Sequence, residues 1–353
     1  MIRGYNGKML EYIGEIIVNP GKSGFLEIPA DRLWKSFHFC MGGDFAVTYS
    51  AGTPKVNHHG VMNGIIRKLV LQNKGGEDLR TYLGISQLIN DQKIDFTDRG
   101  ALLHKGNSAV LGNATSGDDY TVAATTQSNA FYEAVPMFME NRKSLEYYRT
   151  YYSTLGNKAA KIIVDFNNWL QILDSEDAST TTAITGSAVI EVYGHKVDHL
   201  IAPFETFAQH VVSYDQIAPV GNTNATRFTL SPEGELQGFW IRAVKGASEV
   251  RFTYEDMKNT VMEFKFDGET IIKGNLLAIA AINMHDRPLL DVIRGACRID
   301  LLNSKTWGTG LYTGEGSNTK SLEVFITCSV GTPKFYFEFD RIRAAKQAEI
   351  AKA

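Results

Sequence analysis

The sequence predicts an all-β protein built from two similar β-domains in tandem. Three observations point to this class. Apolar and polar residues alternate along many short runs, turn-forming residues separate these runs, and one strand–turn–strand pattern occurs twice. Alternation with a period of two is typical of strands that bury one face against another layer. The 353 residues suit two moderate domains better than one small domain.

The alternating runs extend along most of the chain. They are rich in β-branched and aromatic residues, which suit a half-buried pleated surface. In the run 186–194, for example, Val189, Glu191 and Tyr193 share one predicted face and the residues between them share the other. The clearest runs are 36–41, 44–49, 186–194, 248–254, 262–267, 321–329 and 334–340.

The repeated pattern is a predicted hairpin. In "MEFKFDGETIIKGN" (262–275), Asp267-Gly268 is a strong signal for a two-residue turn. In "RKLVLQNKGGEDLRTYLG" (67–84), paired glycines give a looser version. Setting Gly76 against Gly268 aligns the flanking strands, with a short gap, and puts "ISQLIN" (85–90) opposite "LAIAAIN" (277–283). The echo favours two like domains, with a seam near 213–224, where Pro, Gly and Asn cluster.

Helical signals are few and short. Met9, Ile13 and Ile16 or Ile17 have helical spacing, which predicts a short amphipathic segment near the N-terminus. We also expect a helical turn within 139–156, a short helix over 286–296, and an Ala-rich helical tail over 340–353. Long loops rich in Gly, Ser, Thr and Asn separate the strands, notably 112–129 and 308–320; such loops are usually functional surfaces or contact arms.

Composition argues against several function classes. The net charge of −3 makes the bulk of the chain a poor polyanion binder. Three widely spaced cysteines (Cys40, Cys297 and Cys328) form neither a disulfide framework nor a metal motif. Cys40 and Cys328 lie in alternating apolar runs and are expected to be buried free thiols, which fits a reducing compartment. No secretion signal and no apolar run long enough for a membrane helix are evident.

Catalytic motifs are also missing. His195 and His199 would lie about 13 Å apart on a strand, too far to share a metal. His58 and His59 are better interpreted as surface residues of a loop. The segment "GTGLYTGEG" lacks the ending of a phosphate-binding loop. The sequence therefore predicts no enzyme, no cofactor and no metal, and it favours a protein that works by assembly.

The segments 63–84, 238–274 and 321–340 resemble the double jelly-roll major capsid proteins of tailless icosahedral viruses, a group that includes tectiviruses and corticoviruses. The resemblance is one of pattern over about residues 25–340. It implies two tandem eight-stranded jelly rolls with short helices and long loops. The domains would be an N-terminal arm (1–24), a first jelly roll (25–213), a second (214–340) and a basic tail (341–353).

The resemblance also implies a function. Three chains would form a pseudo-hexameric capsomer, and capsomers would tile the icosahedral shell of a virion such as a bacteriophage. Partners would be neighbouring capsomers and penton or minor capsid proteins, with an internal lipid membrane in many members. The chain would fold in the host cytoplasm, and no sequence-specific nucleic-acid binding is implied.

Two chain ends are candidates for inward-facing contacts. Their contact could be with the membrane, with the genome or with a neighbouring subunit, and the N-terminal segment has too few basic residues to single out anionic lipid. The candidate residues are Met9, Ile13, Ile16, Ile17, Arg341, Arg343, Lys346 and Lys352.

Two rival functions stay open at this point. Tandem jelly rolls also occur in carbohydrate-active hydrolases and amidases, although the missing secretion signal argues against them. A non-catalytic phage receptor-binding protein would also trimerise, but it would form small complexes and no shell.

Overall fold

A computed structural model gives the structure of the chain. It describes residues 10–52, 54–56, 60–73, 75–88, 126–139, 151–154, 160–173, 180–197, 208–219, 222–230, 234–247, 249–285, 294–301, 311–313 and 321–344. These residues fall into two compact units: the first contains the residues up to Gln209 together with Ala344, and the second runs from His210 to Arg343. This division comes slightly before the boundary expected at 213/214.

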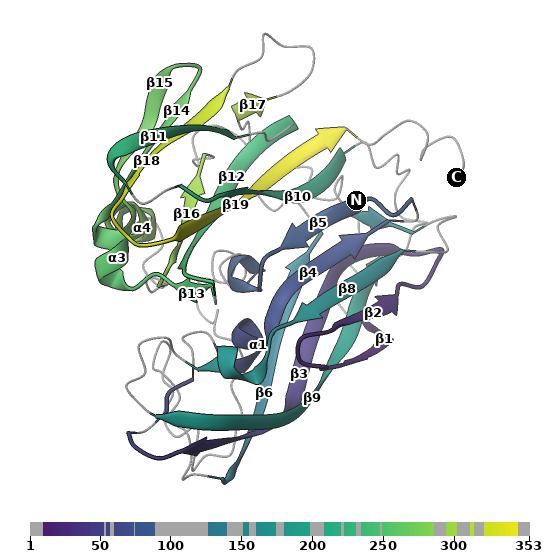
Figure 1. Ribbon diagram of the computed structural model, residues 1–353. Coiled ribbons are helices and arrows are strands. Elements are labelled where there is room, and N and C mark those ends of the chain that lie inside the picture. The colour runs from purple at the N-terminus through teal and green to yellow at the C-terminus, as the bar shows by residue number, and fades with distance from the viewer. Residues whose placement is uncertain are drawn as a thin grey trace. The chain divides into compact units, whose positions relative to one another are not determined.

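The first unit is almost entirely β-structure (Figure 1). Its strands are β1 (Leu10–Ile17), β2 (Ser23–Glu27), β3 (Leu33–Tyr49), β4 (Ile66–Gln72), β5 (Asp78–Tyr82), β6 (Ser128–Phe138), β7 (Tyr152–Ser153), β8 (Lys161–Phe166) and β9 (Thr181–Val197). Among the described residues, the helical segments are α1 (Gly60–Ile65), the 3-10 helix η2 (Trp169–Ile172) and residues 86–88.

These strands form two antiparallel sheets. One has the order β1-β9-β3-β6, with β7 paired to the end of β3, and the other has the order β2-β8-β4-β5. Apart from the two-residue strand β7, successive strands switch between the sheets, and only β4 and β5 follow each other within one sheet. This route is that of a jelly roll, in which two sheets pack face to face over one core.

Strand β3 corrects one expectation. The sequence predicts two strands, over 36–41 and 44–49, but one continuous strand runs through Gly42 and Gly43. The two glycines do not form a turn; they leave space for the backbone of a neighbouring strand. A Cβ atom on Gly43 would lie 2.2 Å from the carbonyl oxygen of Ser187 on the neighbouring strand β9. The pair therefore allows close backbone approach inside a long sheet.

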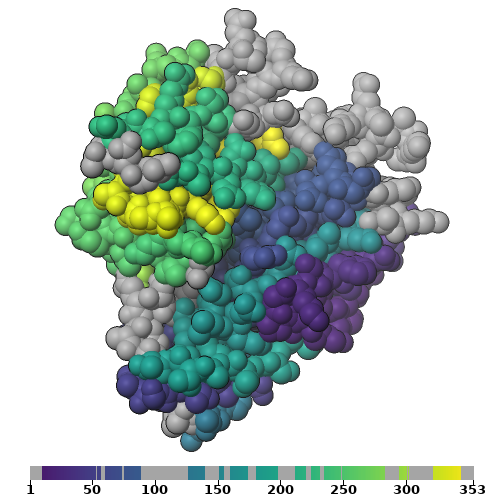
Figure 2. Space-filling view, viewed as in Figure 1, coloured from purple at the N-terminus to yellow at the C-terminus, as the bar shows by residue number. Residues whose placement is uncertain are grey.

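The prediction of a helical segment near the N-terminus is also wrong, because Leu10–Ile17 is strand β1, paired with β9. A β-bulge between Tyr12 and Gly14 inserts an extra residue. The bulge puts Ile13 and Ile16, three residues apart, on the inner side, so their spacing imitates that of a helix. Figure 2 shows this N-terminal part of the chain, in purple, at the surface.

The second unit repeats the strand route of the first. Its strands are β10 (Ala208–Ile217), β11 (Asn222–Leu230), β12 (Gly234–Lys245), β13 (Val250–Arg251), β14 (Thr260–Phe266), β15 (Glu269–Asn275), β16 (Ala296–Asp300), β17 (Leu311–Thr313), β18 (Leu322–Cys328) and β19 (Pro333–Ala344). Its helices are α3 (Tyr254–Lys258) and α4 (Leu276–His285).

One sheet of this unit has the order β11-β18-β14-β15. In the other, β12 lies beside β19, which lies beside β10, and β13, β16 and β17 also pair with β12. Apart from the short strands β13 and β17, which stay in the sheet of β12, strands again alternate between the sheets along the chain, and only β14 and β15 follow each other within one sheet. The hairpins β4–β5 and β14–β15 therefore occupy the same step of the same route.

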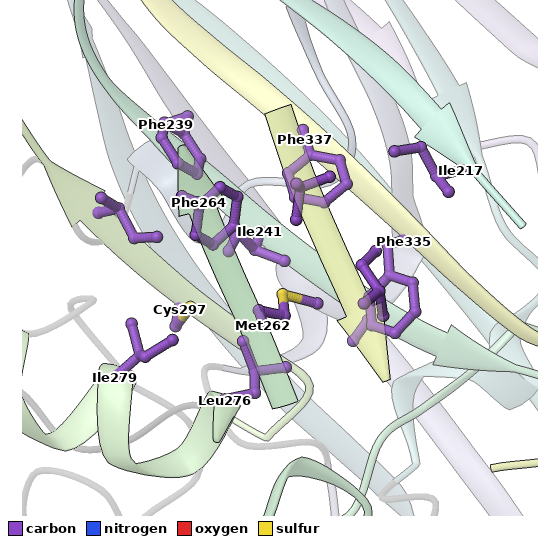
Figure 3. Packing of buried hydrophobic residues seen from close by; sticks show 14 of the residues in the cluster. Ile217, Phe239, Ile241, Met262, Phe264, Leu276, Ile279, Cys297, Phe335 and Phe337 are labelled. Atoms are coloured by element: carbon purple, nitrogen blue, oxygen red, sulfur yellow. The ribbon is translucent and has the colours of Figure 1, made fainter. Parts of the chain in front are cut away.

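Aromatic side chains from both sheets fill the core of the second unit (Figure 3). The ring of Phe264 on β14 lies 5.0 Å from that of Phe239 on β12 and 6.1 Å from that of Phe337 on β19. Leu276 and Ile279 of α4 close one end of the cluster. All of these side chains are at most 3% exposed, so the alternation seen in the sequence corresponds to a real interior.

Both predicted hairpins are confirmed. Phe266 pairs with Glu269, and the two turn residues Asp267 and Gly268 have φ of 53° and 83°. Positive φ at both positions is the signature of a type I′ turn. Gln72 pairs with Asp78 across a longer loop that contains Gly76 at φ 76°.

The other helix predictions fare less well. Residues 340–344 continue strand β19, so the start of the expected C-terminal helix is wrong and its remainder lies outside the described residues. Of the expected helix 286–296, only 294–296 are described, and they form a turn and the start of β16.

The helix of this region, α4, comes earlier in the chain. The side chain of Asn275 caps its start by accepting a hydrogen bond from the Ala278 N–H at 2.7 Å. Of the segment 139–156, the described residues include the short strand β7.

Candidate assembly surfaces

The candidate residues of β1 point in opposite directions. Ile16 is 3% exposed and Ile13 is half-buried, whereas Ile17 is 59% exposed. Successive side chains of a strand alternate between its faces, so a single contact surface cannot contain Ile16 and Ile17 together. Met9 lies outside the described residues.

The basic candidates near the C-terminus are likewise only partly placed. Arg341 is half-buried within β19, opposite Leu236 of β12, and Arg343 belongs to the same strand. Lys346 and Lys352 lie outside the described residues. The candidates that the structure describes therefore belong to two separate strands, β1 and β19.

The outward face of sheet β1-β9-β3-β6 is apolar and acidic. The register sets Ile17, Val189, Gly42 and Tyr132 in one row across the sheet and Glu15, Glu191, Cys40 and Ala134 in the next. Tyr12 and Tyr193 follow, with ring centroids 5.4 Å apart. We call this the acidic aromatic face and define it by Tyr12, Glu15, Ile17, Cys40, Tyr132, Ala134, Val189, Glu191 and Tyr193.

Large apolar side chains on this face are open to solvent. Tyr12 is 53% exposed, Ile17 59% and Tyr132 41%. Their inward neighbours in the sheet, such as Ile190 and Met41, are fully buried. Exposed aromatic and aliphatic side chains gathered on one sheet face are typical of a surface that meets a partner.

The carboxylates of this face lie directly opposite each other. Glu15 pairs with Glu191 across the strands, an arrangement that costs stability when both are charged. Among the described residues, no cation pairs with either one. The Tyr193 hydroxyl donates to Glu191 Oε2 at 3.0 Å, and this bond raises the pKa of Tyr193.

Cys40 and Tyr132 form a second pair on the face. A hydrogen bond with Cys40 raises the pKa of Tyr132 to about 12, and burial raises the pKa of the Cys40 thiol. Both groups are therefore neutral near pH 7. The thiol is no activated nucleophile, because reactive cysteines have depressed pKa values. Cys328 is a buried free thiol, as expected, and Cys297 is buried too, whereas Cys40, also expected to be buried, is only half-buried.

The outward face of sheet β11-β18-β14-β15 has the opposite character. Arg227 pairs with Glu323, and Lys265 and Lys273 both pair with Glu263, at 3.6 and 3.1 Å. Lys265 also lies over the ring of Phe325, 4.9 Å from its centroid. We call this the cationic face and define it by Arg227, Val261, Glu263, Lys265, Ile271, Lys273, Glu323 and Phe325.

The relative exposure of the charged side chains decides that this face presents positive charge to solvent. The side chains of Arg227 and Lys273 are 62% and 63% exposed, whereas Glu323 and Glu263 are only 11% and 20% exposed. The carboxylates lie beneath the cations. The hydrogen bond from Thr270 and the nearby lysines lower the pKa of Glu263, so this group stays charged over a wide pH range.

Glu133 on β6 is a carboxyl group that points inward. It is 1% exposed and accepts hydrogen bonds from the Val61 and Met62 N–H groups at 2.7 and 2.6 Å. Gly60 lets the helix approach, since a Cβ there would lie 2.3 Å from Glu133 Oε1. Burial raises the pKa of Glu133 to about 7. The group fastens α1 to the sheet.

Chemistry beyond this is sparse in the part of the chain that the structure describes. No three His, Cys, Asp or Glu side chains gather there in a way that could hold a metal ion. No described helix is long and apolar enough to cross a membrane. His195 lies half-buried on β9, and His58, His59 and His199 fall outside the described residues.

Sequence reasoning did not select the aromatic and acidic residues of β1, β6 and β9, although the signal was present. The alternation had already set Val189, Glu191 and Tyr193 on one face of a strand. What the sequence could not show is that β1 and β3 flank that strand, because strand neighbours depend on distant pairings.

No protein-family model and no curated protein sequence matches the chain. Solved structures do match it over nearly its whole length. A chain in the atomic structure of Sulfolobus Turreted Icosahedral Virus aligns with a TM-score of 0.67 and 10% identity, over 98% of this chain and 93% of that one. The Faustovirus major capsid protein aligns with a TM-score of 0.56 and 8% identity, over 98% and 92%.

The major capsid protein P2 from bacteriophage PM2 aligns with a TM-score of 0.50 and 11% identity, over 96% of this chain and 99% of that one. At these identities the likeness establishes the fold. Together with the strand route that both units follow, it shows that the chain has the double jelly-roll fold of icosahedral-virus major capsid proteins.

Proposed function

We propose that the chain is a major capsid protein, a structural subunit that forms trimeric, pseudo-hexagonal capsomers and tiles an icosahedral virion shell. The observation that carries the proposal is the repeated strand route. Three copies of a chain with two like units bring six similar blocks together, which is what hexagonal tiling requires. The fold shared with capsid proteins over nearly the full chain supports this role.

The surfaces support an assembling subunit more than an enzyme. Each unit leaves an outward sheet face with large exposed side chains or exposed charges, and assembled proteins bury such faces between subunits. We infer a structural role, with neighbouring capsomers and penton or minor capsid proteins as partners and the virion capsid as location. Folding in the host cytoplasm fits the free thiols.

Contacts at the chain ends belong to the same proposal. The side chain of Ile17 is available for a contact with a membrane or a subunit, whereas Ile16 is committed to the core. For the basic tail, a truncation should begin after Ala344, because Arg341 and Arg343 belong to β19. Loss of residues 345–353 should reduce lipid or genome incorporation and leave folding intact. Unchanged incorporation would show that the tail has no inward-facing role.

The test of the main proposal is the mass of the purified protein in solution. Light scattering across a concentration series should show a species of about three times 39.1 kDa, and larger particles at high concentration. A chain that stays monomeric at every concentration would contradict the proposal. Cleavage of a glycan panel by that monomer would favour the rival hydrolase function.

A further inference from the structure

We infer that the acidic aromatic face of one copy docks against the cationic face of a second copy of this chain. Both faces are open in the single chain, as the exposures of Tyr12, Ile17, Arg227 and Lys273 show. Nothing among the described residues therefore covers either face. The inference rests on the proposed assembly role and names the surfaces that would carry it.

Charge complementarity identifies the partner. On the first face, Glu15 and Glu191 repel each other and have no described cationic partner. On the second face, Arg227 and Lys273 project beyond the carboxylates that they pair with. Bringing a cation near Glu15 and Glu191 would relieve their repulsion, and electrostatic complementarity of this kind fixes the register of an interface.

The two faces also complement each other in their exposed apolar side chains. The first face offers Tyr12, Ile17 and Tyr132, and the second offers Val261 and Ile271, which are 39% and 37% exposed. Both faces belong to antiparallel sheets, and such sheets pack face to face about 10 Å apart. Aromatic residues at the centre of a contact with charges around them are typical of stable interfaces.

The two faces belong to different units of the chain, so the contact is heterologous. Each copy uses one face to bind the copy before it and the other face to bind the copy after it. Contacts of this kind generate closed rings or continuing arrays. Both outcomes suit a subunit of a shell.

Charge exchange tests the inference in the full-length chain. The variant Glu15→Lys/Glu191→Lys should weaken self-association at least about tenfold, because cations would then face cations. The variant Arg227→Glu/Lys273→Glu should weaken it similarly. The fourfold variant that carries all these changes should restore association toward the wild-type level, since the two faces complement each other again.

Controls separate docking from folding and from net charge. Glu27→Lys/Glu255→Lys changes the net charge as much as Glu15→Lys/Glu191→Lys, at exposed positions on β2 and α3, and should leave association unchanged. Thermal unfolding should confirm that each variant is folded. Milder variants, Arg227→Gln/Lys273→Gln, keep the test available where adjacent carboxylates disturb folding.

Outcomes distinguish this inference from the proposed function. If the wild-type protein and the folded charge variants all assemble normally, the docking inference alone is overturned. Failure of the fourfold variant to recover, although it is folded, would likewise overturn it. A wild-type chain that never associates would overturn the proposed function as well.

Discussion

The hairpins β4–β5 and β14–β15 occupy the same step of the strand route in their units, yet they are built differently. The first has a five-residue loop, 73–77, in which Asn73 Oδ1 accepts hydrogen bonds from the Gly75 and Glu77 N–H groups. The second turns within two residues. Residues 79–82 of β5 are all buried, whereas no residue of β15 is. Two hairpins at the same step of the strand route can therefore differ in their turns and in the burial of their residues.

The difference teaches which features a double jelly roll must keep. The route of the strands and the inward apolar residues recur in both units, because they build the two cores. Turn chemistry and outward side chains vary, because solvent or a partner decides what is favourable there. Three tests probe this division between the interior that both units share and the exterior that differs between them.

The largest effect should follow from opening the core beneath the second hairpin. Phe264→Ala on β14 removes a ring that touches Phe239 and Phe337, and truncations of this kind cost about 3–5 kcal/mol of unfolding free energy. Denaturant unfolding measures the loss. The matched control is Phe25→Ala on β2, where the ring is 61% exposed and the loss should stay below about 1 kcal/mol. Equal losses would show that Phe264 is not part of a packed core.

A second test compares a buried glutamate with one on the outward face. The pKa of Glu133 is raised to about 7 from 4.5, so its folded state favours the protonated form. Stability from this group is therefore complete below about pH 4.5 and declines as the pH rises to about 7, by an amount on the order of 3 kcal/mol. Glu133→Gln should remove this decline from the pH dependence of unfolding.

Glu263 should behave with the opposite sign. Its pKa is lowered, so its contribution to stability is present above the unfolded pKa and is lost as the pH falls through the folded value. Glu263→Gln should flatten the acid limb of the stability curve and leave the range near pH 6 unchanged. A flattened region near pH 6 in this variant would contradict the assignment.

The smallest effect concerns the turns. Gly268 and Gly76 both have positive φ, and an added Cβ would meet no atom within 4 Å at either position. Replacing either with Ala therefore costs backbone strain alone, about 1 kcal/mol. Gly331 has equally open space without the positive φ, and Gly331→Ala should be nearly neutral. Thermal unfolding of the three variants compares them. A neutral Gly268→Ala would show that the type I′ turn is not required.

The sequence predicted what depends on local chemistry. Asp267-Gly268 specified a hairpin because few other residues accept positive φ at two successive positions. Alternation located β3, β9, β14, β18 and β19 because each one buries a single face, whereas in the run 248–254 only Val250–Arg251 is strand and Tyr254 begins α3. The N-terminal segment was misassigned because the bulge at Gly14 replaced a period of two with a spacing of three between Ile13 and Ile16. The bulge itself depends on β9, which lies far along the chain.

The assembly surfaces were predictable only in part for the same reason. Each strand pattern indicates which side chains share a face. It does not indicate that Glu15 faces Glu191, or that Lys273 and Lys265 share Glu263, because these contacts join separate strands. The chain-end candidates rest on helical spacing near the N-terminus and on basic residues in the tail, and their contacts stay a prediction; the register of the strands adds Tyr12, Glu15 and Glu191 on one face.

The most direct test of the central claim, that two like units make this chain a capsomer subunit, is electron microscopy of the assembled protein. Class averages of the trimer, viewed along its symmetry axis, should show six similar lobes in a near-hexagonal outline, two from each chain. Averages with three lobes, or particles whose number of chains is not a multiple of three, would contradict the account.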